Sequence, residues 1–211
     1  RRAGALSGFS GIVIAGVALT ASAGALYFGA PVLLTVSYEA IPVPVATSTE
    51  SNKPGKPPAM HLPTPEAVRA IYMTQCVAGT PSFRSELVKF IEESELNAVV
   101  VDIKDFSGGI AFPSSNPALA PYVSKGCGAA DMQSFVQSLH EKGIYVIGRI
   151  TAFQDPLYAA AHPELAVKKE SDGSVWKDYK GLSFIDVGAR PFWNYIVELS
   201  KESYALGFDE L

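Results

Sequence analysis

Charged side chains gather at the end of one strongly apolar run, where the sequence is most informative about chemistry. Residues 98–101 are apolar and mostly β-branched, and Asp102, Lys104, Asp105 and two glycines follow them. Such a run is typical of a strand buried on both faces of a parallel sheet. Residues two apart on a strand share a face, so Asp102 and Lys104 should point the same way. Charges at the carboxyl end of a parallel strand lie where α/β folds bind substrates, although an ion pair that only fills this end is the alternative.

A second apolar run ends with similar chemistry. Residues 144–151 are predicted to form another buried strand, which carries Arg149 near its end and is followed by Asp155 and a proline. The carboxyl ends of neighbouring parallel strands meet at one edge of the sheet. We therefore expect a contact between Asp102 and Arg149, either as part of a site or as an internal ion pair that only fills the fold.

The elements that would position these side chains alternate along the chain. Strands are predicted at 68–74, 98–104 and 144–151, and a fourth begins at 208. Helices are predicted after Ser82, from a cap at Asp131, and over 189–205, where the expected apolar face comprises Trp193, Ile196, Val197, Leu199 and Ser200. A long loop covers 105–130, and an Asp-Gly turn at 172–173 predicts a hairpin.

Alternating strands and helices predict a parallel sheet with right-handed crossovers. This sheet is either doubly wound or the first half of a parallel (β/α)8 TIM-type barrel. The chain lacks a Gly-x-Gly-x-x-Gly fingerprint after its first strand, and charges at successive strand ends favour the barrel.

Composition excludes some classes of partner. The chain has 211 residues, of which 48% are hydrophobic and 18% are charged, with a formal net charge of -4. This balance provides no basic patch, so nucleic acid is not an expected partner. The three histidines are scattered and the two cysteines do not form a metal-binding pattern, so neither a metal nor a cofactor is expected.

The N-terminal third predicts attachment to a membrane. Residues 1–38 contain a long run without charge, Gly8 to Val36, after Arg1 and Arg2, which predicts a transmembrane anchor with a cytoplasmic start. Small residues at 20–25 leave cleavage open. Residues 39–66 are predicted to be an extended linker because they are rich in proline. Residues 67–211 should then be a folded domain outside the cytoplasm. The chain begins without Met and stops as a strand begins, so we expect a fragment of a longer protein.

Several blocks together resemble a bacterial family of domains labelled from sequence as glycoside hydrolase TIM barrels, relatives of the α-amylase-like barrels. The blocks are NAVVVDIKDFSGG, LHEKGIYVIGRITAFQDP, PELAVKKESDGSVWKD and the closing GFDEL, and the resemblance spans residues 68–211. It implies an enzyme that acts on polysaccharides, with its nucleophile on the fourth strand, beyond the end of this chain.

This resemblance gives the candidate residues their expected roles. Asp102 would bind a sugar hydroxyl or orient a buried Arg149, which would keep the nucleophile ionised. Lys104, Asp105 and Asp155 would contact the sugar, or would be solvated loop charges or caps. Trp176 would stack on a sugar face, as Tyr179 could, or would pack the hairpin onto the domain. His140 and His162 have no triad partners in the sequence and are expected to be structural or exposed.

Cys76 and Cys127 follow the first and second strands, so both belong to one end of the sheet. Outside the cytoplasm they could form a disulfide. Three functions remain open at this point: a glycoside hydrolase, a non-catalytic carbohydrate-binding barrel, and a carbohydrate esterase, for which the histidine spacing supplies no metal cluster. The fragment alone is expected to be inactive and unstable, because a half-barrel leaves strand edges exposed.

Overall fold

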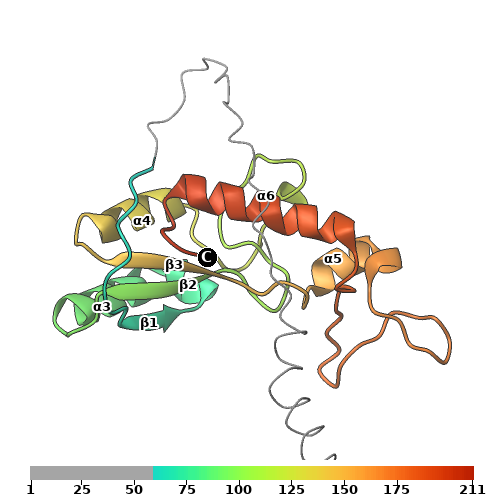
Figure 1. Ribbon diagram of the computed structural model, residues 1–211. Helices are drawn as coiled ribbons and strands as arrows, with labels where there is room; N and C mark the ends of the chain where they lie inside the picture. The colour runs from blue at the N-terminus through green and yellow to red at the C-terminus, as the bar shows by residue number, and fades with distance from the viewer. Residues whose placement is uncertain (1–58) are drawn as a thin grey trace, which may run out of the picture. The chain divides into compact units, whose positions relative to one another are not determined.

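A computed structural model describes residues 59–211, so the predicted anchor at 1–38 and most of the 39–66 linker lie outside the described residues. The centre of the described part is a parallel three-stranded sheet in the order β1-β2-β3 (Figure 1). The strands are β1 (Ala70–Met73), β2 (Ala98–Lys104) and β3 (Tyr145–Ile150). The predicted parallel α/β sheet is confirmed, and β2 has the predicted bounds. Within residues 59–211, no helix combines the length and apolar character needed to cross a bilayer.

The chain begins a fourth strand where the sequence predicts one. Glu210 forms an isolated parallel bridge with Ile147 of β3. The Gly148 amide donates to the Glu210 carbonyl at 2.7 Å, and the Asp209 amide donates to the Val146 carbonyl at 2.9 Å. The sheet therefore grows beyond β3 on the side away from β1.

Helices connect the strands and cover the sheet. They are α2 (Gln75–Ala78), α3 (Pro81–Glu92), α4 (Met132–His140), α5 (Pro156–Ala161) and α6 (Arg190–Leu206), with short 3-10 helices η1 (Ala120–Tyr122) and η2 (Pro163–Leu165). One of the two predicted caps is wrong, and the other holds only in position. Helix α3 begins at Pro81, one residue before Ser82. Asp131 is the N-cap residue of α4, as predicted, but its side chain makes no capping hydrogen bond, because its carboxylate binds the Arg84 guanidinium instead.

The buried face of α6 also differs from the prediction. Phe192, Tyr195, Leu199 and Ser203 are its buried residues, so the prediction is confirmed for Leu199 but is wrong for Trp193, which is 44% exposed. Both sets follow helical spacing, so the sequence alone does not separate them. Aromatic packing determines which face of α6 is buried, because Phe192 and Tyr195 both contact the Tyr158 ring of α5, with ring centroids 4.8 and 4.9 Å apart. Figure 1 shows α5 beside the N-terminal end of α6.

The connection from β2 to α4 is ordered rather than a bare loop. It contains η1 and buries Ile110, Phe112 and Leu119 in the core. A disulfide joins Cys127 of this connection to Cys76 of α2, as the sequence suggests, with Cα atoms 4.4 Å apart. The connection is thereby attached both to the core and to the helix that follows β1.

Candidate functional site

Three side chains from three strands meet near the carboxyl edge of the sheet. The register pairs Asp102 of β2 with Arg149 of β3, and the Arg149 Nη1 donates to Asp102 Oδ1 at 2.7 Å. The Tyr72 hydroxyl of β1 donates to the other oxygen, Oδ2. The predicted Asp102–Arg149 contact is confirmed. The hydrogen bond from Tyr72 to Asp102 was not predicted. The expectation of a buried arginine is wrong, because the Arg149 side chain is 50% exposed.

Exposure separates the roles within this cluster. The Asp102 side chain is 3% exposed and both of its oxygens accept hydrogen bonds. Tyr72 is 48% exposed. Asp102 is therefore a buried support that holds two partners, and the partners, rather than the acid, are exposed at the surface. A phenol ring offers an apolar face, and a guanidinium offers several N–H donors in a fixed plane.

The electrostatics of the cluster favour this arrangement. Burial and the hydrogen bond to the Asp102 carboxylate raise the pKa of Tyr72, so the phenol stays a neutral donor. The hydrogen bond to Asp102 raises the pKa of Arg149, although partial burial opposes it. A neutral donor and a permanent cation thus flank one carboxylate, and neither changes its charge in the physiological pH range.

Lys104 and Asp155 form an ion pair away from the surface of the sheet edge. A register irregularity separates Asp102 from Lys104 on β2. The Lys104 Nζ lies 3.0 Å from Asp155 Oδ2, and both side chains are fully buried. Burial lowers the pKa of Lys104 more than the neighbouring Asp155 raises it, and burial likewise raises the pKa of Asp155.

This pair holds backbone rather than a ligand. The Lys104 ammonium also donates to the carbonyls of Thr151 and Ala152 after β3. The Asp155 Oδ1 accepts from the Tyr158 amide at 2.8 Å and caps α5. The pair therefore fixes the ends of two strands beneath the surface, and the alternative prediction of a cap is confirmed for Asp155. That Lys104 or Asp155 contacts a sugar stays a prediction.

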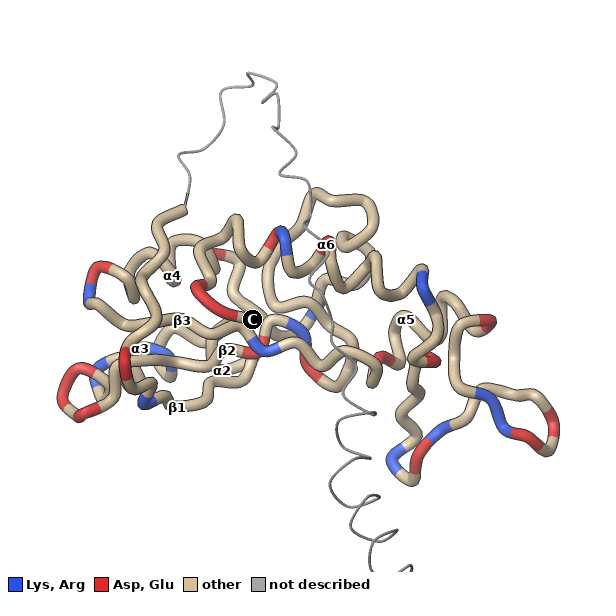
Figure 2. Tube along the Cα trace, viewed as in Figure 1, with Lys and Arg blue, Asp and Glu red and all other residues tan. Residues whose placement is uncertain are grey.

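The remaining candidates are dispersed. Asp105 closes a turn by accepting hydrogen bonds from the amide and hydroxyl of Ser107 at 2.9 and 2.6 Å. Trp176 is 40% exposed and its ring lies 5.5 Å from that of Phe184, within the protruding segment 165–185, whereas Tyr179 is 91% exposed. Figure 2 shows acidic and basic residues interspersed along this segment. Among residues 59–211 no contact joins Trp176 to the Tyr72–Asp102–Arg149 cluster.

Two features escaped the sequence prediction. Tyr72 could have been found by register, because it lies near the end of β1 as Asp102 does near the end of β2. His140 was given no partner, yet its Nε2 lies 2.9 Å from Asp209 Oδ2 at the opposite edge of the sheet. Within the described part of the chain, no three His, Cys, Asp or Glu side chains are grouped so as to hold a metal ion.

Comparisons with known proteins agree with this architecture. A family model described as "Putative glycosyl hydrolase domain" matches residues 70–211. A crystal structure of a hypothetical protein from Ruminiclostridium thermocellum is 33% identical, with a TM-score of 0.61 over 66% of this chain and 73% of that one. The comparison with curated proteins gives no match.

More distant structures share the fold alone. A chitobiase from Flavobacterium johnsoniae is 16% identical, with a TM-score of 0.52 over 68% of this chain. A glycoside hydrolase family 20 β-N-acetylglucosaminidase is also 16% identical, with a TM-score of 0.50 over 67% of this chain. This chain spans only 22% and 34% of those two proteins.

Proposed function

The chain belongs to the family of this glycosyl hydrolase domain, and from that membership we propose that the protein is a glycoside hydrolase acting on a polysaccharide or oligosaccharide. The observation that carries the proposal is the Tyr72–Asp102–Arg149 cluster near the carboxyl edge of a parallel sheet. This edge is where α/β folds gather their substrate-binding groups.

We further propose that the sheet is the first part of a (β/α)8 barrel. Three parallel strands in sequential order and a parallel bridge to Glu210 beyond β3 support this architecture. Tyr72, Asp102 and Arg149 would then lie inside the barrel near its mouth. A sugar could stack on the Tyr72 ring while Arg149 donates to its oxygens.

The acid and base would come from other residues. Glycosidases use two carboxyl groups, ~5–5.5 Å apart for retention or ~6.5–9.5 Å apart for inversion. Both Asp102 oxygens are already engaged, so Asp102 fits a supporting role better than that of acid or nucleophile. We propose that the nucleophile follows on the fourth strand, where the Arg149 cation would favour its ionised form.

The proposed place of action is outside the cytoplasm, with the N-terminal segment as a membrane anchor. The uncharged run after Arg1 and Arg2 supports this location. The Cys76–Cys127 disulfide supports it as well, because disulfides persist in oxidising compartments.

A non-catalytic carbohydrate-binding barrel is the second candidate. It is favoured by the hydrogen bonds to both Asp102 oxygens, because these bonds leave the most buried acid of the cluster without a free oxygen for acid–base chemistry.

The test uses the full-length protein on a panel of polysaccharides, with released reducing ends and bound glycan measured separately. Tyr72→Ala should weaken glycan binding up to about tenfold. Tyr72→Phe keeps the aromatic ring for stacking, so its glycan affinity should fall less. Phe90→Ala, at an exposed aromatic residue on the helix α3, is the control and should behave as wild type. Release that falls with binding supports the hydrolase. Binding without release supports the second candidate, and neither on any glycan refutes both.

A further inference from the structure

A pocket of about 430 Å³ lies between the 3-10 helix η1 and the helices α5 and α6. Small-molecule sites have volumes of roughly 300–1,000 Å³. The pocket is near the carboxyl edge of the sheet, because α5 begins directly after Asp155, which pairs with Lys104 at the end of β2. None of its lining residues belongs to the Tyr72–Asp102–Arg149 cluster, so the pocket is a separate site.

Three prolines and three tyrosines form most of the lining. The tyrosines are Tyr122 of η1, Tyr158 of α5 and Tyr195 of α6, and they are 8%, 7% and 4% exposed. Their rings contact one another, with centroids 5.2 Å apart for the two pairs that include Tyr122 and 4.9 Å apart for the third. The packed rings give the pocket an apolar wall that also carries hydroxyl groups.

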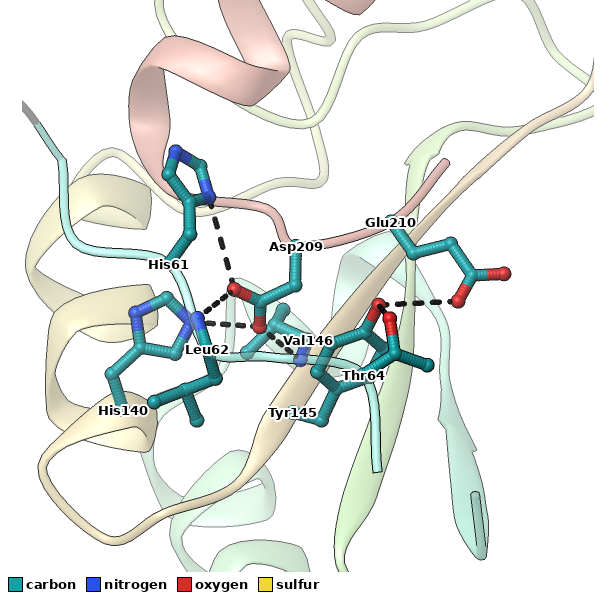
Figure 3. Close-up of polar contacts among 8 residues, drawn as sticks. All are labelled: His61, Leu62, Thr64, His140, Tyr145, Val146, Asp209 and Glu210. Carbon is teal, nitrogen blue, oxygen red and sulfur yellow. Dashed lines mark hydrogen bonds and ion pairs between the residues drawn. The ribbon is translucent and has the colours of Figure 1, made fainter. Parts of the chain in front are cut away.

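The Tyr195 hydroxyl is buried and has no hydrogen-bond partner within the described part of the chain. Buried polar groups usually have one. Asp209, a buried side chain at the opposite edge of the sheet, is an example: its two oxygens accept hydrogen bonds from the amides of Leu62 and Val146 at 2.7 and 2.8 Å (Figure 3). An unpaired hydroxyl in the lining of a pocket therefore points to a ligand that brings hydrogen-bonding groups.

The polar groups of the lining favour a neutral ligand. No Lys or Arg is among the lining residues of this pocket, so a phosphate or carboxylate would find no fixed cation there. The Glu198 carboxylate already accepts a hydrogen bond from a lysine ammonium on the same helix at 2.8 Å. Burial raises the pKa of each of the three tyrosines, and the negative charge of Asp155 adds to this, so their hydroxyls stay neutral.

We propose that this pocket binds a neutral sugar unit, as a second glycan-binding site of the domain. A pyranose has C–H faces that suit proline and tyrosine rings, and its hydroxyls both donate and accept hydrogen bonds. Asn194, an exposed lining residue, supplies an amide that can do the same. The inference rests on the proposed function for the identity of the glycan. One polysaccharide that occupies both sites would bind more tightly than either site alone allows.

Calorimetric titration and thermal unfolding of the full-length protein test the proposal, with neutral hexasaccharides of glucose, xylose and N-acetylglucosamine as probes. The parent protein for these measurements carries Tyr72→Ala, which removes the stacking ring of the other proposed site and leaves the pocket intact. At least one probe should still bind this parent and raise its melting temperature.

Two pocket variants of this parent remove single groups. Tyr195→Phe deletes the unpaired hydroxyl and keeps the ring. Its melting temperature without probe should stay the same or rise, since an unpaired buried hydroxyl is unfavourable, whereas its probe affinity should fall about threefold to tenfold, the effect of one net hydrogen bond. Asn194→Ala should lower the affinity by a similar factor at an unchanged melting temperature. Tyr204→Phe is the matched control, at a tyrosine of α6 that is 58% exposed and outside the pocket, and should behave as the parent.

Two results would overturn the second site. One is that no probe binds the Tyr72→Ala parent, and the other is that probe affinity is the same in the parent and in both pocket variants. If Tyr195→Phe loses melting temperature along with affinity, its hydroxyl is structural and Asn194→Ala decides. Release of reducing ends by the protein with Tyr72 intact reports on the proposed function separately. Without release from any polysaccharide, a lower affinity in the pocket variants still supports the pocket while the hydrolase fails.

Discussion

The buried ion pair between Lys104 and Asp155 should stabilise the carboxyl edge of the sheet, and removing one of its charges tests this. Both side chains are fully buried, with Nζ and Oδ2 3.0 Å apart. The substitution Lys104→Met keeps much of the side-chain volume and removes the charge, which leaves the Asp155 carboxylate buried without a cation. Removing one partner of a buried pair costs about 3–5 kcal/mol, so we expect the free energy of unfolding to fall by that amount at neutral pH.

The pH dependence of this loss has a defined sign. Burial raises the pKa of Asp155, and Lys104 opposes that rise, so removing Lys104 leaves the pKa raised further. A carboxyl group whose pKa is higher in the folded state binds protons more tightly there, so stability increases as pH falls through the folded value. The deficit of Lys104→Met should therefore be largest at neutral pH and should shrink as the solution becomes acidic.

The double variant Lys104→Met/Asp155→Asn separates charge from packing. The amide keeps an oxygen that can accept the Tyr158 N–H, so α5 stays capped and most of the lost stability should return. Lys201→Met is the matched control, because Lys201 is 68% exposed and its bond to Glu198 should contribute less than about 1 kcal/mol. Urea unfolding of the full-length protein measures all three. A Lys104→Met loss no larger than the control, or no recovery in the double variant, would refute the reasoning.

Three further changes test other parts of the fold. Cys76→Ser should lower the free energy of unfolding by up to about 4 kcal/mol, because the disulfide closes a loop with a sequence separation of 51; urea unfolding with and without reductant measures it. Deleting the residues before Pro65 should cost about 1–3 kcal/mol more than deleting those before Ala59, since Asp209 loses the Leu62 amide; melting temperatures would show the difference. Gly128→Ala should be destabilising by more than about 1 kcal/mol in thermal unfolding, because Gly128 has φ +110 and an added Cβ would lie 2.4 Å from a backbone oxygen.

The sequence predicted those features that depend on local pattern. The run Ala98–Lys104 is a strand with the expected bounds, since its β-branched residues suit a sheet covered on both faces. The contact between Asp102 and Arg149 followed from two strands whose ends meet at one edge. The cysteine pairing followed in the same way, from two segments that leave neighbouring strands at that edge.

Features set by packing between distant segments escaped prediction. Lys104 was expected to share the environment of Asp102, but the irregularity between them directs the ammonium to the loop after β3. The apolar face of α6 was predicted correctly only for Leu199, because large residues lie on both sides of the helix and contact with Tyr158 determines which side is buried. Residues 59–64 were predicted to be part of an extended linker, since nothing in their composition reveals Asp209, 147 residues away, whose carboxylate accepts a hydrogen bond from the Leu62 amide.

Each edge of the sheet contains a buried aspartate, and the two aspartates differ in how exposed their partners are. Asp102 and Asp209 are both buried and both hydrogen-bonded through each oxygen. The partners of Asp102 reach solvent, with Arg149 50% exposed, whereas Asp209 holds a buried His140 and backbone amides. The exposed partners of Asp102 suit the proposed binding site, whereas the contacts of Asp209 join segments of the fold. Asp102→Asn should therefore weaken glycan binding more than it lowers the melting temperature, and Asp209→Asn should do the reverse. Equal effects of the two substitutions on both measurements would show that exposure of the partners does not distinguish the two edges.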